Sequence, residues 1–187
     1  MTDALAEHLA VAQRIDQLLP QVDDAAQRVI ASYGRGGRVF AFGNGGSAAD
    51  AQHLAAELVG RYKRERRALP AVALTVDPSV VTAIGNDYSF DDLFARQVEG
   101  LVRTDDVVVG FTTTGRSANV LRGLAAARAA GATTVLFSGG DETVEADVAL
   151  VVPSPTTARV QEMHLLLMHL LLDRIDAWAA GEDGASA

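Results

Sequence analysis

Runs of apolar residues divide the chain into five short segments separated by longer stretches with a helical repeat. The short segments read as buried strands, because four or five apolar residues in a row leave no face for water. They cover residues 39–42, 71–75, 107–111, 133–137 and 147–152. Strands that alternate with helices favour right-handed βαβ units. The pattern therefore predicts an α/β fold, a doubly wound parallel sheet of five strands with helices on both faces.

The N-terminal segment has helical spacing but no candidate chemistry. Apolar residues recur every three or four positions from Leu5 to Leu19 and from Val22 to Tyr33, which predicts two helices or one helix kinked at Pro20. Packing or subunit contact is the expected role. We therefore expect a single domain over 1–187, with an N-terminal helical segment (1–33), a sheet-and-helix core (36–178) and a flexible tail (179–187).

The segment 158–178 predicts a long helix with an unusual middle. Every residue from Leu165 to Leu172 is apolar except His169. A helix without a polar face has to be covered on all sides, and in a domain of this size part of that cover is expected from another subunit. His169 is then either a core histidine with satisfied hydrogen bonds or an active-site group in a dry pocket.

The loop after the first strand is the strongest candidate for binding. Gly43, Asn44, Gly45 and Gly46 predict a tight turn with permissive backbone angles, and Ser47 suits the N-cap of the next helix, with Asp50 completing an acidic capping box. Bare amides, the helix dipole and a hydroxyl together favour an anion, most often a phosphate.

Two polar residues follow on the same helix. His53 and Glu57 are four positions apart, so they project from one face and could share a metal ion or divide acid and base work. The alternative is a partly exposed helical pair without chemistry. Arg61 extends the row by another four residues, and its plain interpretation is an ion pair with Glu57.

A second polar loop follows the third strand. Thr112, Thr113, Thr114 and Ser117 supply four hydroxyls in six residues, just before a helix that is expected to begin near Ala118. These groups could hold a phosphate, whereas the alternative is a Thr-rich turn capped by Ser117. In an open parallel sheet both loops lie at the carboxyl edge of the strands, where such folds bind ligands. The run 63–67, KRERR, is better interpreted as a solvated surface than as a phosphate clamp.

Composition narrows the class of protein. A net charge of -8 argues against a nucleic-acid or anionic-membrane surface, and the absence of cysteine excludes disulfides, thiolate nucleophiles and cysteine metal sites. The N-terminus carries acids where a signal peptide carries bases, and no apolar run approaches membrane-spanning length. We expect a cytoplasmic protein whose metal ligands, if any, are His, carboxylate or amide.

Five motifs in order resemble those of the sedoheptulose 7-phosphate isomerases, also called phosphoheptose isomerases, within the sugar-isomerase (SIS) domain family. They are GNGGSAADAQHLAAELVGRY (43–62), LPAVALT (69–75), AIGNDY (83–88), TTTGRSANV (112–120) and RVQEMHLLLMH (159–169). The resemblance covers roughly residues 36–178. It implies a flavodoxin-like sheet, a homotetramer with active sites at subunit contacts, and conversion of sedoheptulose 7-phosphate to D-glycero-D-manno-heptose 7-phosphate, the first step toward activated heptoses.

The resemblance also implies roles for individual residues. Glu57 would be the base and His169 the acid of an enediol mechanism. A divalent metal, commonly zinc and one per chain, would be held by His53, Glu57, Gln161 and His169. The sugar would contact Asn44, Gly45, Gly46, Ser47, Glu57, Arg61, Asn86, Asp87 and Gln161, and the phosphate would contact Thr112, Thr113, Thr114 and Ser117.

The phosphate loop departs from the family pattern, and the spacing of two proposed metal ligands is difficult to reconcile with it. The phosphate loop of the family usually reads Ser-Thr-Ser-Gly-Asn-Ser, whereas here two threonines replace serines and Arg116 replaces the asparagine. Gln161 and His169 are eight residues apart, which on a helix means about 12 Å along the axis and about 80° of rotation. Both side chains reach one ion only if they lean toward each other.

Two other functions stay open. One is a non-catalytic SIS-domain adaptor like the relative that associates with the bacterial replication initiator, although that relative lacks the acid and the histidine that this chain has at Glu57 and His169. The other is an isomerase of a different sugar phosphate. In all three cases the partners are a small sugar phosphate or other protein chains, without nucleic acid or membrane.

Overall fold

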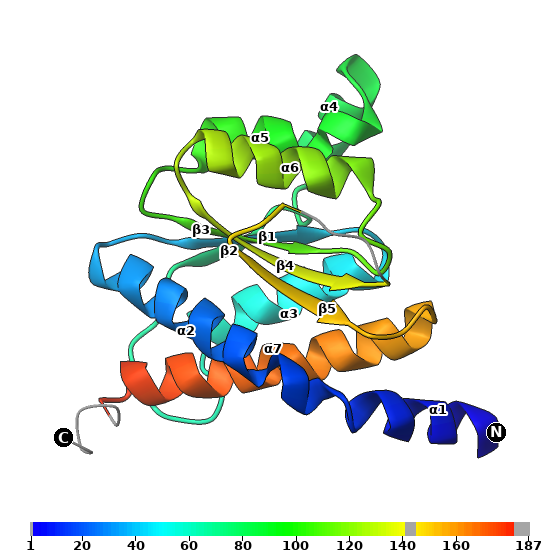
Figure 1. Cartoon of the computed structure of the whole chain (residues 1–187). Coiled ribbons are helices and arrows are strands. Elements are labelled where there is room, and N and C mark those ends of the chain that lie inside the picture. The colour runs from blue at the N-terminus through cyan, green and yellow to red at the C-terminus, as the bar shows by residue number, and fades with distance from the viewer. Residues whose placement is uncertain (1, 141–144, 182–187) are drawn as a thin grey trace.

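Five parallel strands form the centre of the structure, a computed structural model that describes residues 2–140 and 145–181 (Figure 1). The strands are β1 (Val39–Gly43), β2 (Ala71–Ala73), β3 (Val107–Phe111), β4 (Thr133–Gly139) and β5 (Val148–Val152), in the spatial order β2-β1-β3-β4-β5. This is the flavodoxin-like order, so the predicted doubly wound five-stranded parallel sheet is confirmed.

The strand ends differ slightly from the prediction. β2 ends at Ala73 instead of Thr75, because β2 is an edge strand and its pairing with β1 stops at Ala41 opposite Ala73. β4 runs two residues past Phe137, because its pairing with β5 continues until Gly139 lies opposite Val152. Hydrogen bonding to the neighbouring strand therefore sets these strand ends, and the apolar pattern of the sequence does not show where that bonding stops.

Helices cover both faces of the sheet and enclose two apolar cores. Helices α2 (Leu19–Gly34), α3 (Gly46–Val59) and α7 (Thr157–Ala179) lie on one face, and α4 (Pro78–Asp87), α5 (Leu93–Leu101) and α6 (Ala118–Ala129) lie on the other (Figure 1). Alternate residues of β1 enter opposite cores, Val39 and Ala41 on the α3 side and Phe40 and Phe42 on the α6 side. Burial on both faces explains why β1 and β3, in the middle of the sheet, are apolar along their length.

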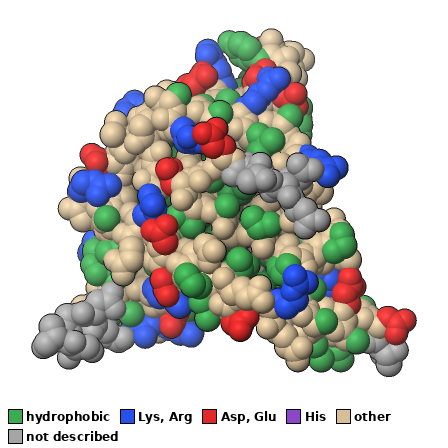
Figure 2. Space-filling model, viewed as in Figure 1, with side chains coloured by type: hydrophobic (Ala, Val, Ile, Leu, Met, Phe, Trp, Pro, Cys, Tyr) green, Lys and Arg blue, Asp and Glu red, His purple; other side chains and the backbone are tan. Residues whose placement is uncertain are grey.

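The N-terminal segment forms two helices, α1 (Thr2–Ala12) and α2, joined by a short 3-10 turn at Ile15–Leu18. The predicted break at Pro20 is wrong, because Pro20 lies in the first turn of α2, where its missing N–H costs no hydrogen bond. α1 extends away from the sheet and leaves Leu5 and Leu9 exposed by 61% and 53%. Figure 2 shows apolar side chains at the outer ends of the molecule, where α1 and α4 lie, and mixed charges across the rest of this face.

The long helix α7 extends one residue past the predicted end at Trp178. One side packs into the core, while Leu165 and Leu166 are 37% and 39% exposed in the single chain. None of the helices within residues 2–140 and 145–181 is long and apolar enough to cross a membrane. Of the predicted tail 179–187, residues 182–187 lie outside the described residues.

Candidate active site

Helix α3 begins within a residue of its predicted start, but the cap differs from the prediction. Gly45 occupies the N-cap position with a φ of 57°, a conformation that glycine adopts without strain. Ser47 lies inside the first turn, where it is buried and its amide donates to the Asn44 carbonyl at 3.0 Å. The predicted Ser47–Asp50 capping box is therefore wrong. Instead Asp50 turns inward, and burial raises the pKa of its carboxyl against the opposing effect of His53.

Three of the predicted site residues meet between α3 and α7. His53 Nε2 lies 3.3 Å from Glu57 Oε1, and the rings of His53 and His169 are 5.2 Å apart in an edge-to-face arrangement. The side chains of His53 and Glu57 are 37% and 25% exposed, so they border the surface. Burial and the nearby His53 lower the pKa of His169, while Glu57 acts in the opposite sense. Near neutral pH the His169 ring is therefore uncharged and keeps one N–H to donate.

Gln161 lies two turns before His169 and contacts a different part of α3. Its side-chain amide packs so closely on Gly46 that a Cβ at position 46 would collide with the amide nitrogen. Since Gln161 meets the start of α3 and His169 meets His53, α3 and α7 run side by side in the same direction. The two α7 side chains thus face points about two turns apart on α3, which is the separation that the eight-residue spacing predicts.

The predicted metal ligands suit a divalent ion in their chemistry. Imidazole, carboxylate and amide are donors that zinc accepts, and two donors bound to one tetrahedral zinc lie about 3.3 Å apart, like His53 Nε2 and Glu57 Oε1. Within the part of the chain that the structure describes, however, no three His, Cys, Asp or Glu side chains converge on one position. His53 and Glu57 therefore fit as a pair, and the full ligand set remains a prediction.

Arg61 does not continue the row of His53 and Glu57. The helix ends at Val59, with Gly60 as its C-cap, and the chain turns away before Arg61. The Arg61 Nε lies 3.7 Å from Glu65 Oε2, so the predicted Glu57–Arg61 pair is replaced by an exposed Arg61–Glu65 pair. A glycine at the helix end explains the error, since helical spacing has no meaning beyond it.

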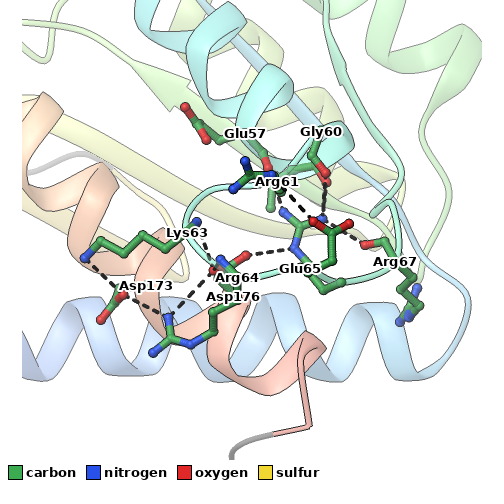
Figure 3. Close-up of polar contacts among 11 residues, drawn as sticks. Glu57, Gly60, Arg61, Lys63, Arg64, Glu65, Arg67, Asp173 and Asp176 are labelled. Atoms are coloured by element: carbon green, nitrogen blue, oxygen red, sulfur yellow. Dashed lines mark hydrogen bonds and ion pairs between the residues drawn. The ribbon is translucent and has the colours of Figure 1, made fainter.

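The solvated run predicted at 63–67 is wrong at one position. The side chain of Arg66 is 1% exposed and its Nε donates to Asp176 Oδ1 on α7 at 2.9 Å. Figure 3 shows Asp176 beside Arg64 of the same loop. Neither a wet surface nor a phosphate clamp describes Arg66. Its neighbour Tyr62 stacks on the His169 ring, with centroids 5.4 Å apart and planes 19° apart. Sequence reasoning missed Arg66, Tyr62 and Asp176, because nothing in local spacing links a charged loop to a helix 110 residues later.

The second polar loop forms a compact hydroxyl turn at the carboxyl end of β3. Thr112 is buried, and its Oγ1 lies 3.0 Å from Ser117 Oγ. The Arg116 amide donates to Thr114 Oγ1 at 3.2 Å, and Gly115 provides the turn with a φ of 70°. Ser117 occupies the predicted N-cap position of α6, but its hydroxyl turns toward Thr112 rather than over the helix amides. Ser117 therefore leaves the amides of Ala118 and Asn119 for an anion, whereas the Val120 amide donates to Asn119 Oδ1 at 2.9 Å.

The two loops are joined by a pair of asparagines. Asn44 and Asn119 exchange two side-chain hydrogen bonds of 2.8 Å each, and Asn119 is 2% exposed. Because β1 and β3 are neighbours in the sheet, this pair holds the glycine loop against the hydroxyl loop. Sequence reasoning missed Asn119. The available signal was an amide in the first turn of the helix that follows the hydroxyl loop.

Asn86 and Asp87 lie apart from the other predicted residues. Both are exposed at the end of α4, on the α5–α6 side of the sheet, and the Asn86 amide donates to Asp87 Oδ1 at 2.7 Å (Figure 1). Among the described residues, no hydrogen bond or ion pair links either of them to His53, Glu57 or His169. Within a single chain, Asn86 and Asp87 therefore do not join the acid–base cluster of His53, Glu57 and His169.

Comparison with known proteins places this site in a family. Residues 5–139 match the family model described as SIS domain. A phosphoheptose isomerase of Aquifex aeolicus is 51% identical over 159 residues, which cover 83% of each chain. One from Helicobacter hepaticus is 47% identical over 180 residues, which cover 95% of this chain and 91% of the relative.

Solved structures agree in fold and in sequence. A phosphoheptose isomerase from Neisseria gonorrhoeae has a TM-score of 0.87 and 42% identity, covering 94% of this chain and 96% of its own. One from Francisella tularensis has a TM-score of 0.89 and 33% identity, covering 94% and 95%. With the sheet order, both loops and the His53–Glu57–His169 cluster in place, the chain belongs to the phosphoheptose isomerase family of SIS-domain proteins.

Proposed function

We infer that this chain is an aldose–ketose isomerase that converts sedoheptulose 7-phosphate to D-glycero-D-manno-heptose 7-phosphate. Relatives with the name phosphoheptose isomerase match most of the chain at about half identity. The observation that carries the inference is that Glu57 and His169, from two different helices, both contact His53, on a helix that begins at the glycine loop. A binding-only adaptor has no need of a carboxylate and an imidazole at these two positions.

The reaction moves a proton from C1 to C2 through an enediol. In the proposed mechanism the Glu57 carboxylate takes the proton from C1, and His169 donates its N–H to the carbonyl oxygen on C2. The imidazolate then takes the O1 proton of the enediol and becomes imidazole again, and Glu57 returns its proton to C2. Both groups end as they began, so atoms and charge balance. A neutral His169 ring fits the donor role, and its lowered pKa is in line with that state.

The two loops would bind the phosphate and orient the sugar. The hydroxyls of Thr112, Thr113, Thr114 and Ser117, with the first amides of α6, provide donors for a phosphate. Asn44, Gly45, Gly46 and Ser47 would border the sugar on the side of α3, together with Arg61 and Gln161. Binding energy from the distant phosphate would fix C1 and C2 against the acid–base pair.

We propose a divalent metal, with zinc as the best fit to the donors, held by His53, Glu57, Gln161 and His169. When bound, such an ion supplies positive charge next to the sugar oxygens that become anionic during enolisation. The 3.3 Å separation of His53 Nε2 and Glu57 Oε1 and the lack of thiolate ligands support this choice.

We further propose a homotetramer with active sites at subunit contacts, in the cytoplasm. Asn86 and Asp87, exposed on a protruding helix, would complete the site of a neighbouring chain. Leu165, Leu166, Leu5 and Leu9 are exposed in the single chain and would be covered by other copies.

Turnover of sedoheptulose 7-phosphate by the purified chain tests the function. Proton NMR should show the aldose heptose 7-phosphate appearing at the expense of the ketose. Sedoheptulose without its phosphate is the control, and it should react far more slowly, since the loop contacts are lost. An inactive chain that still binds the sugar phosphate would support the adaptor class instead.

A further inference from the structure

A buried ion pair joins α3 and α7, the two helices that carry the acid–base cluster of His53, Glu57 and His169. Arg66 Nε donates to Asp176 Oδ1 at 2.9 Å, and both side chains are only 1% exposed. Asp176 lies on α7, seven residues and thus two turns after His169, on the same side of the helix. Arg66 lies in the loop that follows α3. The pair therefore connects the end of the Glu57 helix to the His169 helix.

Arg66 also caps the C-terminal end of α3. Its Nη2 donates to the backbone carbonyl of Glu57 at 2.7 Å, and its Nη1 donates to those of Leu58, Gly60 and Arg67 at 2.9, 3.3 and 2.8 Å. The final carbonyls of a helix have no partner within the helix, and a cation there also suits the helix dipole. The backbone of Glu57 itself is thereby held by Arg66.

Asp176 uses its other oxygen to hold the loop that carries Tyr62. Asp176 Oδ2 accepts from the backbone amides of Lys63 and Arg64 at 3.1 and 2.7 Å. Burial alone would raise the pKa of Asp176, but these two amides and the Arg66 guanidinium together lower it, so the carboxylate is charged. The residue just before these amides, Tyr62, stacks on the His169 ring at 5.4 Å.

We propose that Arg66 and Asp176 form a positioning pair that sets the placement of the catalytic base relative to the acid. One branch runs from Arg66 to the backbone of Glu57, and the other runs from Asp176 through the loop amides and Tyr62 to the His169 ring. This role rests on the proposed function, since it takes Glu57 and His169 as the acid–base residues. Stability is a weak reason for such a pair, because apolar residues of similar size often stabilise a core as well as a buried ion pair does.

The first test removes the charge of Asp176 and keeps its shape. In Asp176→Asn, kcat for sedoheptulose 7-phosphate should fall by about 10- to 100-fold, because a small displacement of reacting groups is enough to do so. The dissociation constant of the sugar phosphate should stay within about threefold of wild type, because the phosphate loop lies elsewhere.

Asp173→Asn is the matched control. Asp173 lies one turn before Asp176 on α7 and pairs with Lys63 and Arg64 at 3.3 and 3.1 Å, but it is 41% exposed and does not bond to Arg66. The same chemical change there should leave kcat within about twofold of wild type. Equal loss of activity in both variants, or wild-type kcat in a folded Asp176→Asn chain, would overturn the proposal.

Tyr62→Leu provides a second variant if Asp176→Asn fails to fold. Tyr62 is half-buried at the surface and its replacement by leucine leaves no buried charge, so the fold should persist. Loss of the ring should again lower kcat with little change in affinity. A Tyr62→Leu chain with kcat within twofold of wild type would disprove the branch through His169.

A spectroscopic readout separates this proposal from the proposed function. In protein labelled at histidine, the Tyr62 ring should move the His169 ring-proton signals upfield, and Asp176→Asn should move them toward their position in Tyr62→Leu. Asp173→Asn should leave them unchanged. This measurement needs no substrate, so it tests the positioning role independently of turnover. A wild-type chain that does not turn over sedoheptulose 7-phosphate would overturn only the proposed function. Signals that are identical in wild type and Asp176→Asn would contradict the positioning role.

Discussion

Asn44 and Asn119 face each other with both side-chain amides, each donating one hydrogen bond of 2.8 Å to the other. Asn119 Oδ1 also accepts from the Val120 amide at 2.9 Å, which fixes its orientation on α6. The two residues are 75 positions apart, and their pair links the glycine loop to the first turn of α6, the helix that follows the hydroxyl loop. The relative placement of the two proposed binding loops therefore depends on it.

Asn119→Ala should weaken both stability and substrate binding. Loss of the pair leaves the half-buried Asn44 amide without its partner, which costs about 1–3 kcal/mol of unfolding free energy. The glycine loop is then no longer held against the hydroxyl loop, so KM should rise more than kcat falls. Urea unfolding and steady-state kinetics measure the two effects.

Gln52→Ala is the control for this prediction. Gln52 makes an exposed amide–hydroxyl bond of 3.2 Å to Thr75, away from the loops. Its loss should change the unfolding free energy by less than about 0.5 kcal/mol, as is usual for surface substitutions. An unchanged KM in Asn119→Ala would show that the asparagine pair does not organise the binding loops.

Glu57→Gln separates chemistry from binding. Glutamine keeps the size and one acceptor oxygen but takes no proton from carbon, so turnover should fall by about 10²- to 10⁴-fold, the usual effect of a lost base. Affinity for sedoheptulose 7-phosphate should remain similar, since the proposed phosphate contacts lie on the hydroxyl loop. Metal content has to be compared in the same samples, because an amide is the weaker ligand.

Solvent deuterium gives the sharper measurement for Glu57. Wild type should exchange label into the proton that moves between C1 and C2, whereas Glu57→Gln should not. If the variant exchanges and turns over like wild type, Glu57 is not the base, and the mechanism is wrong even though the family assignment stands.

The apolar pattern was enough to predict the sheet, because its central strands β1, β3 and β4 are covered on both faces. Phe40 and Phe42 point to one core and Val39 and Ala41 to the other, so both faces of β1 require apolar side chains. The acid–base cluster was predicted in part for a similar reason, since His53 and Glu57 lie one turn apart on a helix whose start the glycines mark. The apolar setting of His169 left a core histidine and an active-site group open, and only the family resemblance gave it the role of the acid.

Two of the errors have local causes, and the third comes from a partner far away in the sequence. Gly45 takes the N-cap position with a positive φ, so Ser47 lies in the first turn rather than at the cap. Gly60 ends α3 before Arg61, and this end breaks the row of polar residues. Arg66 looked solvated because its four neighbours in the run are charged, while its burial depends on Asp176, 110 residues away. Long-range partners of this kind leave no trace in spacing.

Elemental analysis tests the proposed metal. Protein purified without chelator should contain about one divalent ion per chain if His53, Glu57, Gln161 and His169 share it. His53→Ala should lower that content, and Asp50→Ala, one turn earlier on α3, is the control that should not. Full turnover after complete removal of metal would leave the four residues as an acid–base site without an ion.

Sedimentation at micromolar concentration tests the assembly. The exposed leucines of α1 and α7 favour burial against other copies, so the chain should sediment as a tetramer. Leu165→Glu together with Leu166→Glu should dissociate it, since charges do not suit an apolar contact, and activity should fall with it if Asn86 and Asp87 act across subunits. A stable monomer with full activity would rule out both the tetramer and the shared site.

His164 predicts how the stability of the protein depends on pH. The ring is fully buried against Phe111 and Phe137, its Nε2–H donates to the Ser138 carbonyl at 3.1 Å, and burial lowers its pKa from 6.5 to about 4. Above pH 6.5 the ring is neutral in both the folded and the unfolded chain, so it adds no pH dependence. Below pH 6.5 His164 takes up a proton in the unfolded chain but stays neutral in the folded chain until the pH approaches 4, so acid favours unfolding.

The size of the effect follows from the two pKa values. Each pH unit between them is worth up to about 1.4 kcal/mol, so the free energy of unfolding should fall by about 3 kcal/mol between pH 6.5 and pH 4. His164→Gln keeps an amide N–H for the Ser138 carbonyl but does not titrate. The variant should be less stable at pH 7, and its stability should fall less steeply between pH 6.5 and 4, because only the carboxylates common to both proteins still respond. Urea unfolding at a series of pH values measures the difference. Parallel curves for the two proteins would mean that His164 takes up its proton in the folded chain as readily as in the unfolded one, and the buried neutral ring would be the wrong description.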